Sequence, residues 1–240
     1  MKKEKFAWWI KRIEANLKLV DYVRIDHFRG FEAYWSVPAN EDTAINGQWI
    51  KAPGQELFAE IKKQLGDIPV IAEDLGVITP EVEALRDDFD LPGMRILQFA
   101  FDPNEAGAGG FTNIFLPHMY CQKTIAYTGT HDNDTLQGWL NEADDGVINV
   151  IQDYVAKGLA ENRPSRESLC ANIISLAFFS NADFAIIPLQ DVFGLDSRAR
   201  MNIPSTSGGT NWQWRMEPAY FSDEKAAWLK YMALYSGRNM

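Results

Sequence analysis

Residues 19–30 read Leu-Val-Asp-Tyr-Val-Arg-Ile-Asp-His-Phe-Arg-Gly. The apolar residues of this stretch alternate as in a buried β-strand, and the pattern predicts a strand that ends at Asp26. Side chains two positions apart lie on the same face of a strand, so Arg24 is predicted to lie beside Asp26. A neighbouring cation keeps a carboxylate ionised and fixes its orientation. An acid at the end of a strand, crowded by Arg24, His27 and Arg29, therefore indicates a chemical role for Asp26.

The composition bounds the class of protein. The chain has 240 residues and a formal net charge of −10 at pH 7. This length suffices for one large domain, and α/β barrels are often of this size. The acidic balance argues against nucleic acid as a partner, because phosphate binding needs a basic patch.

Cysteine use and hydropathy bear on the compartment. Two cysteines, Cys121 and Cys170, give no disulfide framework and are typical of a reducing compartment. No apolar run approaches the roughly 18 residues of a membrane span. The amino-terminal segment is amphipathic and lacks the apolar core of a signal peptide. We therefore expect a soluble, cytoplasmic protein without a membrane partner.

Strands and helices alternate along the chain, which predicts a parallel sheet covered by helices. Apolar runs predict strands that end at Asp26 and Glu73, followed by strands at residues 94–101, 124–127 and 184–189. Helices are predicted at residues 6–20, 55–65, 134–141, 146–160, 166–179 and 223–236. A further helix is predicted to begin at Thr79-Pro80, because threonine is a good N-cap and proline is tolerated in the first turn. Residues 31–53 are predicted to form a long irregular loop, and loops of that length are commonly functional.

Three acids follow apolar strands directly: Asp26, Glu73 and Asp132. In a parallel α/β fold the residues after the strands converge at one end, which is where such folds place their sites. Two carboxylates that flank a glycosidic bond can serve as nucleophile and as general acid. The third acid would orient sugar hydroxyls, and His131 could donate a hydrogen bond to one of them. The pattern predicts a site for glycosyl transfer.

Other interpretations of these acids stay open on sequence grounds. An acid after a strand is often a helix N-cap, which fits Asp74 and Asp134 better than Asp26. Alternatively, His131, Asp132 and Asp134 could ligate a metal ion, since histidine and carboxylates do so in hydrolase sites. Only three histidines occur, and no second histidine lies at a ligand spacing from His131, so this alternative is weaker. Three tryptophans are predicted in loops, where they could stack on sugar rings: Trp35, Trp212 and Trp214.

Several segments in the same order resemble one enzyme family over nearly the whole chain. They read RIDHFRGFEAYW (24–35), PANEDTAINGQWIKAPG (38–54), IAEDLGVITPEVEALRDDF (71–89), PGMRILQFAFD (92–102), FLPHMY (115–120), YTGTHDNDT (127–135) and ARMNIPSTSGGTNWQWR (199–215). They are similar to the 4-α-glucanotransferases called amylomaltase or disproportionating enzyme, of the α-amylase clan. The resemblance implies a (β/α)8 TIM barrel. It also implies that residues 1–240 form one part of it, roughly strands 4 to 8, with no separate second domain.

The resemblance also implies roles for individual residues. Asp26 would be the nucleophile, Glu73 the acid/base and Asp132 the transition-state stabiliser. Arg24 and His131 match residues that orient the substrate and the nucleophile, and two further residues match positions that line the sugar site: Phe99 and Asn202. The implied reaction is a retaining transfer of α-1,4-glucan segments between maltooligosaccharides, with no metal or organic cofactor.

Family members are much longer than this chain, and the resemblance places residues 1–240 in their carboxy-terminal half. Five strands cannot close an eight-stranded barrel, and an open sheet edge exposes backbone groups. We therefore expect the missing amino-terminal half or self-association to complete the barrel, and the chain alone to be inactive. Two alternatives remain: an α-glucan hydrolase that uses water as acceptor, and a non-catalytic carbohydrate-binding fragment.

Overall fold

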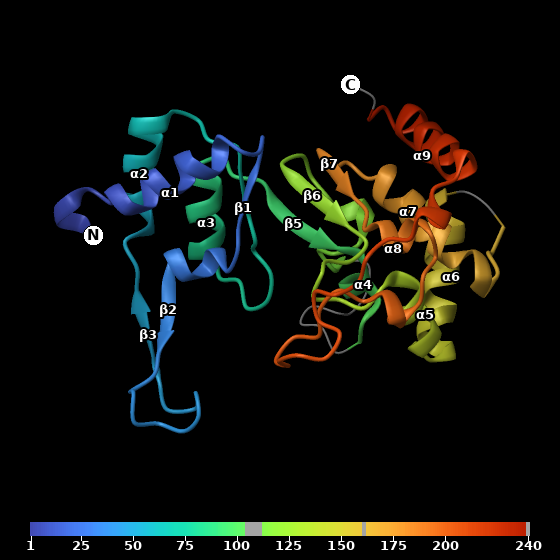
Figure 1. Ribbon diagram of the computed structural model, residues 1–240, viewed down its shortest axis with the longest axis horizontal. Helices are drawn as coiled ribbons and strands as arrows, with labels where there is room; N and C mark the ends of the chain where they lie inside the picture. Colours follow the sequence, from blue (N-terminus) through green and yellow to red (C-terminus); the bar gives the residue numbers. More distant parts are fainter. Residues whose placement is uncertain (104–111, 160–161, 239–240) are drawn as a thin grey trace. The chain divides into compact units, whose positions relative to one another are not determined.

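The computed structural model describes residues 1–103, 112–159 and 162–238, and its contacts divide the chain into two compact units (Figure 1). Unit 1 comprises residues 1–94 and unit 2 comprises residues 95–240, and each is described by itself. Within the described ranges, no helix combines the length and the apolar character needed to cross a bilayer. The prediction that residues 1–240 form a single domain stays a prediction.

Unit 1 is built on two parallel strands with helices packed against them. Its elements are η1 (Lys2–Glu4), α1 (Ala7–Leu17), β1 (Val23–Ile25), η2 (Phe28–Phe31), β2 (Ala33–Ser36), β3 (Gln48–Lys51), α2 (Gly54–Leu65), β4 (Val70–Ala72) and α3 (Pro80–Asp88). Strands β1 and β4 pair in parallel, with Ile25 opposite Ala72. The pairing continues past both strands, because the Glu73 amide donates to Ile25 O at 3.0 Å and the Phe28 amide donates to Glu73 O at 3.1 Å. The predicted strands at Asp26 and Glu73 are confirmed, and their ends lie side by side.

Helix α2 shows why this part of the chain folds as predicted. Leu57, Phe58 and Ile61 recur at helical spacing and are almost fully buried in the core of unit 1. Gly66 follows the last turn with φ 80°, a conformation that costs glycine little, so the helix ends there. Thr79 takes the N-cap position of α3 and Pro80 its first position. These helix boundaries could be predicted because the signals are local.

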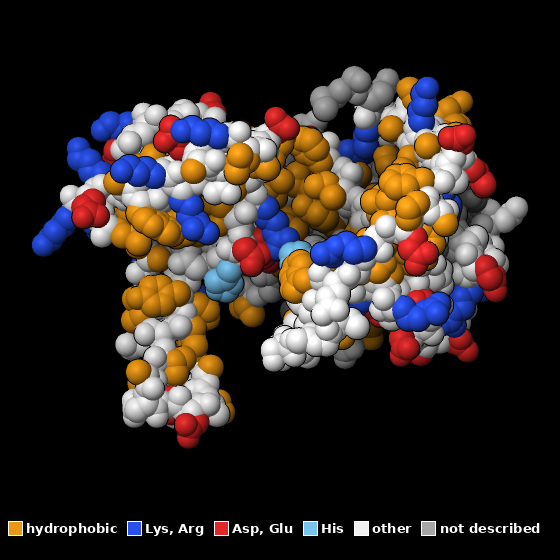
Figure 2. All heavy atoms as spheres, viewed as in Figure 1, with side chains coloured by type: hydrophobic (Ala, Val, Ile, Leu, Met, Phe, Trp, Pro, Cys, Tyr) orange, Lys and Arg blue, Asp and Glu red, His pale blue; other side chains and the backbone are white. Residues whose placement is uncertain are grey.

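The loop prediction for residues 31–53 is wrong, because this segment contains an antiparallel hairpin of β2 and β3. Trp35 lies opposite Trp49, and their rings meet edge to face with centroids 5.4 Å apart. The hairpin extends away from the helices of unit 1 (Figure 1), and hydrophobic side chains line its stem (Figure 2). Both tryptophans stay about half exposed, so the pairing rests on cross-strand contact and not on a buried face. The alternation that normally identifies a strand is therefore weak here.

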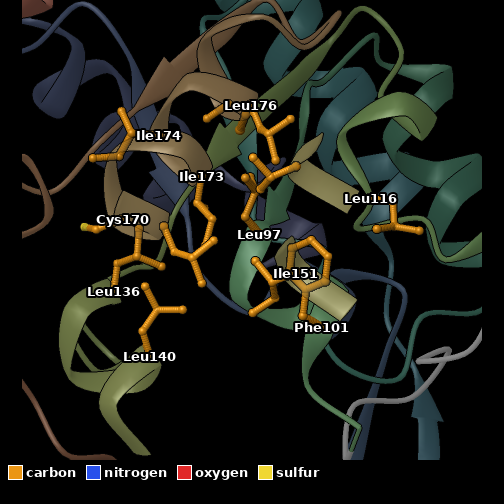
Figure 3. Close-up of a cluster of buried hydrophobic side chains, with 14 of the residues drawn as sticks. Leu97, Phe101, Leu116, Leu136, Leu140, Ile151, Cys170, Ile173, Ile174 and Leu176 are labelled. Atoms are coloured by element: carbon orange, nitrogen blue, oxygen red, sulfur yellow. The ribbon is translucent and has the colours of Figure 1, made fainter. Parts of the chain in front are cut away.

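Unit 2 contains a three-stranded sheet in the order β5-β6-β7 and a larger helical part. Its elements are β5 (Gly93–Ile96, which spans the boundary of the units), α4 (Leu97–Phe101), η4 (Pro117–Met119), β6 (Thr124–Tyr127), α5 (Leu136–Glu142), α6 (Asp145–Leu159), η5 (Arg166–Ser168), α7 (Leu169–Phe178), β7 (Phe184–Ile186), α8 (Leu189–Val192), η6 (Ser197–Ala199), η7 (Pro218–Tyr220) and α9 (Asp223–Tyr235). Strands β6 and β7 pair in parallel, with Tyr127 opposite Ile186. The buried side chains of α4, α5, α6 and α7 meet in one core (Figure 3). Leu140, Ile151 and Leu169 are completely buried there.

The predicted strand at residues 94–101 is too long. Strand β5 ends at Ile96, and the chain continues as the short helix α4. Leu97, Ala100 and Phe101 all pack in the core of unit 2, a spacing of three and four residues that fits one face of a helix and breaks the alternation of a strand. The strand at residues 184–189 is shortened in the same way, since β7 ends at Ile186 and α8 begins at Leu189.

Candidate active site

Asp26 lies directly after β1, with its side chain 80% exposed. Arg24, two residues earlier on the same face of the strand, forms an ion pair with the Asp26 carboxylate through Nη2. The arrangement predicted from the period of the strand is therefore observed. An exposed carboxylate held by one arginine retains a free face toward solvent, as a nucleophile requires.

Glu73 follows β4, the strand that pairs with β1. The backbone amide of His27 donates to Glu73 Oε2 at 2.6 Å. His27 has φ 49°, an unfavourable conformation for a residue other than glycine, and strained backbone of this kind is frequent at functional sites. Burial raises the pKa of Glu73 above its usual range, the amide of His27 lowers it, and the nearby negative charge of Asp26 raises it. A carboxyl group that keeps its proton to higher pH is suited to general acid catalysis.

Asp74 is not the helix N-cap that its position after a strand suggests. Its side chain is nearly completely buried, and Oδ2 forms a 2.5 Å ion pair with Arg86 Nη1. Oδ1 accepts the amide of Met94 at 2.7 Å. A Cβ atom on Gly93 would lie 2.5 Å from Asp74 Oδ2, so the carboxylate occupies the space that this glycine leaves open. Arg86 and the Met94 amide therefore fix Asp74, the residue directly after Glu73, within the core.

Arg29 was expected beside Asp26, but its described contacts are with other residues. Its guanidinium donates to Val77 O and lies over the ring of Trp49 with 3.9 Å to the ring centroid. Arg29 is buried, and these contacts attach the hairpin to the body of unit 1. It is a structural cation, and among the described contacts Arg24 is the arginine paired with Asp26.

Unit 2 gathers a second group of predicted residues around Asp132. Asn202 Nδ2 donates to Asp132 Oδ1 at 2.7 Å, and His131 Nε2 lies 3.3 Å from Asp132 Oδ2. Arg200 Nη2 donates to the backbone oxygen of Asp132 at 2.7 Å. The loop after β6 and the segment after η6, about 70 residues apart in sequence, thus meet at one carboxylate. Arg200 was not predicted from the sequence, although it lies two residues before Asn202 in the same motif.

Further contacts complete this cluster. The His131 and Trp212 rings lie 5.1 Å apart between centroids, so one of the three candidate stacking tryptophans does contact a predicted site residue. Asp134 is not the N-cap of α5: Thr135 is, and its hydroxyl accepts the amide of Gly138 at 3.0 Å. Asp134 instead accepts the Ser197 hydroxyl at 2.6 Å.

The predicted residues fall into two groups. Arg24, Asp26 and Glu73 come together in unit 1, and His131, Asp132 and Asn202 come together in unit 2. Phe99 lies in α4, and the ring contact described for it is with Phe115, edge to face at 5.4 Å. The described residues contain no group of three or more histidine, cysteine or acidic side chains in a metal-binding arrangement, so the metal alternative has no ligand set there.

Comparison with known proteins decides the family. Residues 1–236 match the protein family described as 4-alpha-glucanotransferase. The chain belongs to this family. It is 49% identical over 237 residues to the 4-alpha-glucanotransferase of Synechocystis sp., covering 98% of this chain and 44% of that protein. It is likewise 49% identical over 235 residues to that of Thermus thermophilus, covering 97% of this chain and 45% of that protein.

A solved structure supports the same assignment. The amylomaltase from Streptococcus agalactiae in complex with acarbose superimposes with a TM-score of 0.89 at 36% sequence identity. The superposition covers 100% of this chain and 46% of the amylomaltase chain. The predicted fold, part of a (β/α)8 barrel, is therefore confirmed. The chain spans less than half of the length of the relatives it matches.

Proposed function

We propose that this chain carries the acidic residues of a 4-α-glucanotransferase, which moves α-1,4-glucan segments between maltooligosaccharides by a retaining mechanism. The observation that supports it most is the pair of carboxyl groups after β1 and β4. Asp26 is exposed and paired with Arg24, whereas Glu73 is half-buried and its pKa is raised. Two carboxyl groups with different environments take different roles, one as nucleophile and one as acid.

In the first step the Asp26 carboxylate attacks the anomeric carbon of the donor, and the bond to the leaving glycosidic oxygen breaks. Glu73 gives its proton to that oxygen, so the shortened glucan leaves as a neutral alcohol. The product is a glycosyl ester of Asp26 and an ionised Glu73. In the second step Glu73 takes the proton of an acceptor 4-hydroxyl, whose oxygen displaces Asp26 from the anomeric carbon.

Asp132 assists without forming a bond to the sugar. Its carboxylate, which binds Asn202 and lies near His131, would accept hydrogen bonds from sugar hydroxyls and stabilise positive charge on the ring. Trp212, in contact with His131, offers an aromatic face to an apolar face of a pyranose ring.

The substrate class rests on the relatives. The relatives from Synechocystis sp. and Thermus thermophilus are named 4-alpha-glucanotransferase, and the amylomaltase that superimposes on this chain is in complex with acarbose. We infer the same class of ligand for this chain, an action in the cytoplasm, and completion of the barrel by further strands. Light scattering of the purified chain would test self-association, because an open edge of a parallel sheet favours pairing with another chain.

Turnover can be tested in a chimera in which residues 1–240 replace the matching segment of the Thermus thermophilus relative. With maltotriose, a transferase yields glucose together with longer oligosaccharides, whereas a hydrolase yields only shorter sugars. We expect longer oligosaccharides, and we expect Asp26→Asn to abolish nearly all turnover while acarbose binding persists. Asp21→Asn, an exposed acid before the same strand, is the matched control and should keep full activity. More than a few per cent of activity in Asp26→Asn would make the nucleophile assignment wrong, and exclusively shorter products would favour the hydrolase.

A further inference from the structure

A second acid of unit 2, Asp191 in α8, makes contacts on both sides of the loop that carries Asp132. Its side chain is only 2% exposed. Asp191 Oδ2 accepts the hydroxyl of Thr128 at 2.5 Å, and Oδ1 accepts the backbone amide of Leu136 at 2.7 Å. Both carboxylate oxygens are therefore engaged, each by a donor from a different part of the chain.

The two donors flank the loop that contains His131 and Asp132. Thr128 follows β6 immediately and is fully buried, and Leu136 is the first residue of α5. One carboxylate thus holds both ends of residues 129–135. A pocket of about 160 Å³ is lined by His131 from this loop and by Asp191 from α8.

The segment that contains Asp191 also supplies the residues that hold Asp132 directly. Gln190, the neighbour of Asp191, donates to Ala199 O at 3.3 Å, which connects α8 to η6. Arg200 and Asn202 follow η6 and donate to the backbone and the side chain of Asp132. The connection after β7 therefore holds the Asp132 loop at its ends and at its carboxylate.

Packing alone does not explain why an acid occupies position 191. Among the residues that the structure describes, no lysine or arginine forms an ion pair with it, and its donors are a hydroxyl and an amide. The titratable neighbours are Asp134 and Cys170, whose thiol donates to the backbone oxygen of Asp191 at 3.4 Å, while Arg200 lines the same pocket. Burial is the main cause that raises the pKa of Asp191 to about 6. A buried acid without a cation is unfavourable for folding, and an apolar residue would pack there without that penalty. Only a carboxylate supplies two acceptor oxygens here, one for the Thr128 hydroxyl and one for the Leu136 amide.

We propose that Asp191 is a positioning residue that fixes the loop of residues 129–135, and with it His131 and Asp132, by accepting hydrogen bonds from Thr128 and Leu136. This inference rests on the proposed function only for the roles of His131 and Asp132. The placement of the loop can be tested without turnover.

The test compares the chain with Asp191→Asn, in which the amide keeps the shape but offers one acceptor in place of two. We expect hydrogen exchange of the backbone amides of residues 130–136 to become about tenfold faster or more, while the amides of α7 keep their rates. The NMR signal of the His131 ring, displaced by the ring current of Trp212, should shift, and the signals of His27 and His118 should stay in place.

Asp183→Asn is the matched control. Asp183 also joins two strands of this sheet through one amide, that of Lys123 at 2.9 Å, but it does so before β6 and β7 and not after them. It should leave the loop amides and the His131 signal unchanged. Thr128→Val removes one of the two hydrogen bonds and should give a smaller change of the same pattern, which decides the question if Asp191→Asn does not fold. Equal acceleration throughout unit 2, or an unchanged His131 signal in both variants, would overturn the proposal.

Discussion

Each unit has a buried carboxylate that lies in, or bonds to, the segment of a predicted catalytic acid, but the two are stabilised in different ways. In unit 1, Asp74 adjoins Glu73 and forms an ion pair with Arg86, whose side chain is only 14% exposed. In unit 2, Asp191 binds both ends of the loop that carries Asp132, and its side chain receives only neutral donors. Both carboxylates also accept a backbone amide near the start of an element: Met94 is the second residue of β5, and Leu136 is the first residue of α5.

This difference in bonding partners predicts a different sensitivity for each buried acid. An ion pair in a low dielectric depends on both partners, so the loss of either leaves an uncompensated charge. A carboxylate held by neutral donors is instead sensitive to pH, because desolvation raises its pKa toward the physiological range. Unit 1 should therefore fail when a partner is removed, and unit 2 should respond when the pH changes.

Removal of the cation in unit 1 should have the largest effect on stability. We expect Arg86→Met to reduce the free energy of unfolding by about 3–5 kcal/mol, because Asp74 would remain buried and charged. Asp74→Asn in the same chain should restore part of that loss. Urea-induced unfolding at pH 7 measures both.

Arg163→Met is the control for this experiment. Arg163 pairs with Asp153 at 2.8 Å, but about half of each side chain is exposed. Exposed ion pairs contribute about 0–1 kcal/mol, so this change should be small. Equal losses for Arg86→Met and Arg163→Met would show that burial of the Asp74 pair does not matter.

The acid in unit 2 should make stability depend on pH. The pKa of Asp191 in the folded chain is raised to about 6 from the ordinary 3.8, so the folded state favours the protonated carboxyl. The stabilisation is fully present below about pH 4 and is lost as the pH rises through about 6. At about 1.4 kcal/mol per unit of pKa shift the full effect is about 3 kcal/mol, and the stability of Asp191→Asn relative to the parent chain should rise by about 2 kcal/mol of this between pH 4 and pH 7. Urea unfolding of both chains across this range measures it, and a difference independent of pH would contradict the pKa shift.

The two threonine N-caps should give the smallest difference. The Thr135 hydroxyl accepts the Gly138 amide of α5 in unit 2, whereas the Thr79 side chain makes no such capping bond to α3 in unit 1. Thr135→Ala should therefore reduce the free energy of unfolding by about 1 kcal/mol, and Thr79→Ala by less. Thermal unfolding of the two variants would show the order, and a larger loss for Thr79→Ala would reverse the comparison.

The features that could be predicted from the sequence depend on residues close together in the chain. The strand before Asp26, its pairing with Arg24 and the end of α2 at Gly66 follow from periods of two and 3.6 residues and from glycine. The family motifs added Asn202, and the structure places its side chain on Asp132. These are regularities that a single segment contains.

The features that could not be predicted depend on contacts between distant segments. The position of Asp74 after a strand suggested a helix cap, but its carboxylate binds Arg86 and the Met94 amide instead. Asp191 gave no signal, because its partners lie 63 and 55 residues away. The hairpin could not be predicted from alternating hydrophobicity, because Trp35 and Trp49 pair across the strands while both rings stay about half exposed.

The most direct test of the central claim is the titration of Glu73 by carbon-13 NMR in the chain and in Asp26→Asn. The charge of Asp26 contributes to the raised pKa of Glu73, after the larger contribution of burial. We therefore expect the pKa of Glu73 to lie above 4.5 in the parent chain and to fall in Asp26→Asn, with Asp21→Asn unchanged. An ordinary pKa for Glu73 in the parent chain, or a pKa that does not change in Asp26→Asn, would contradict the claim that these two carboxyl groups act as a pair.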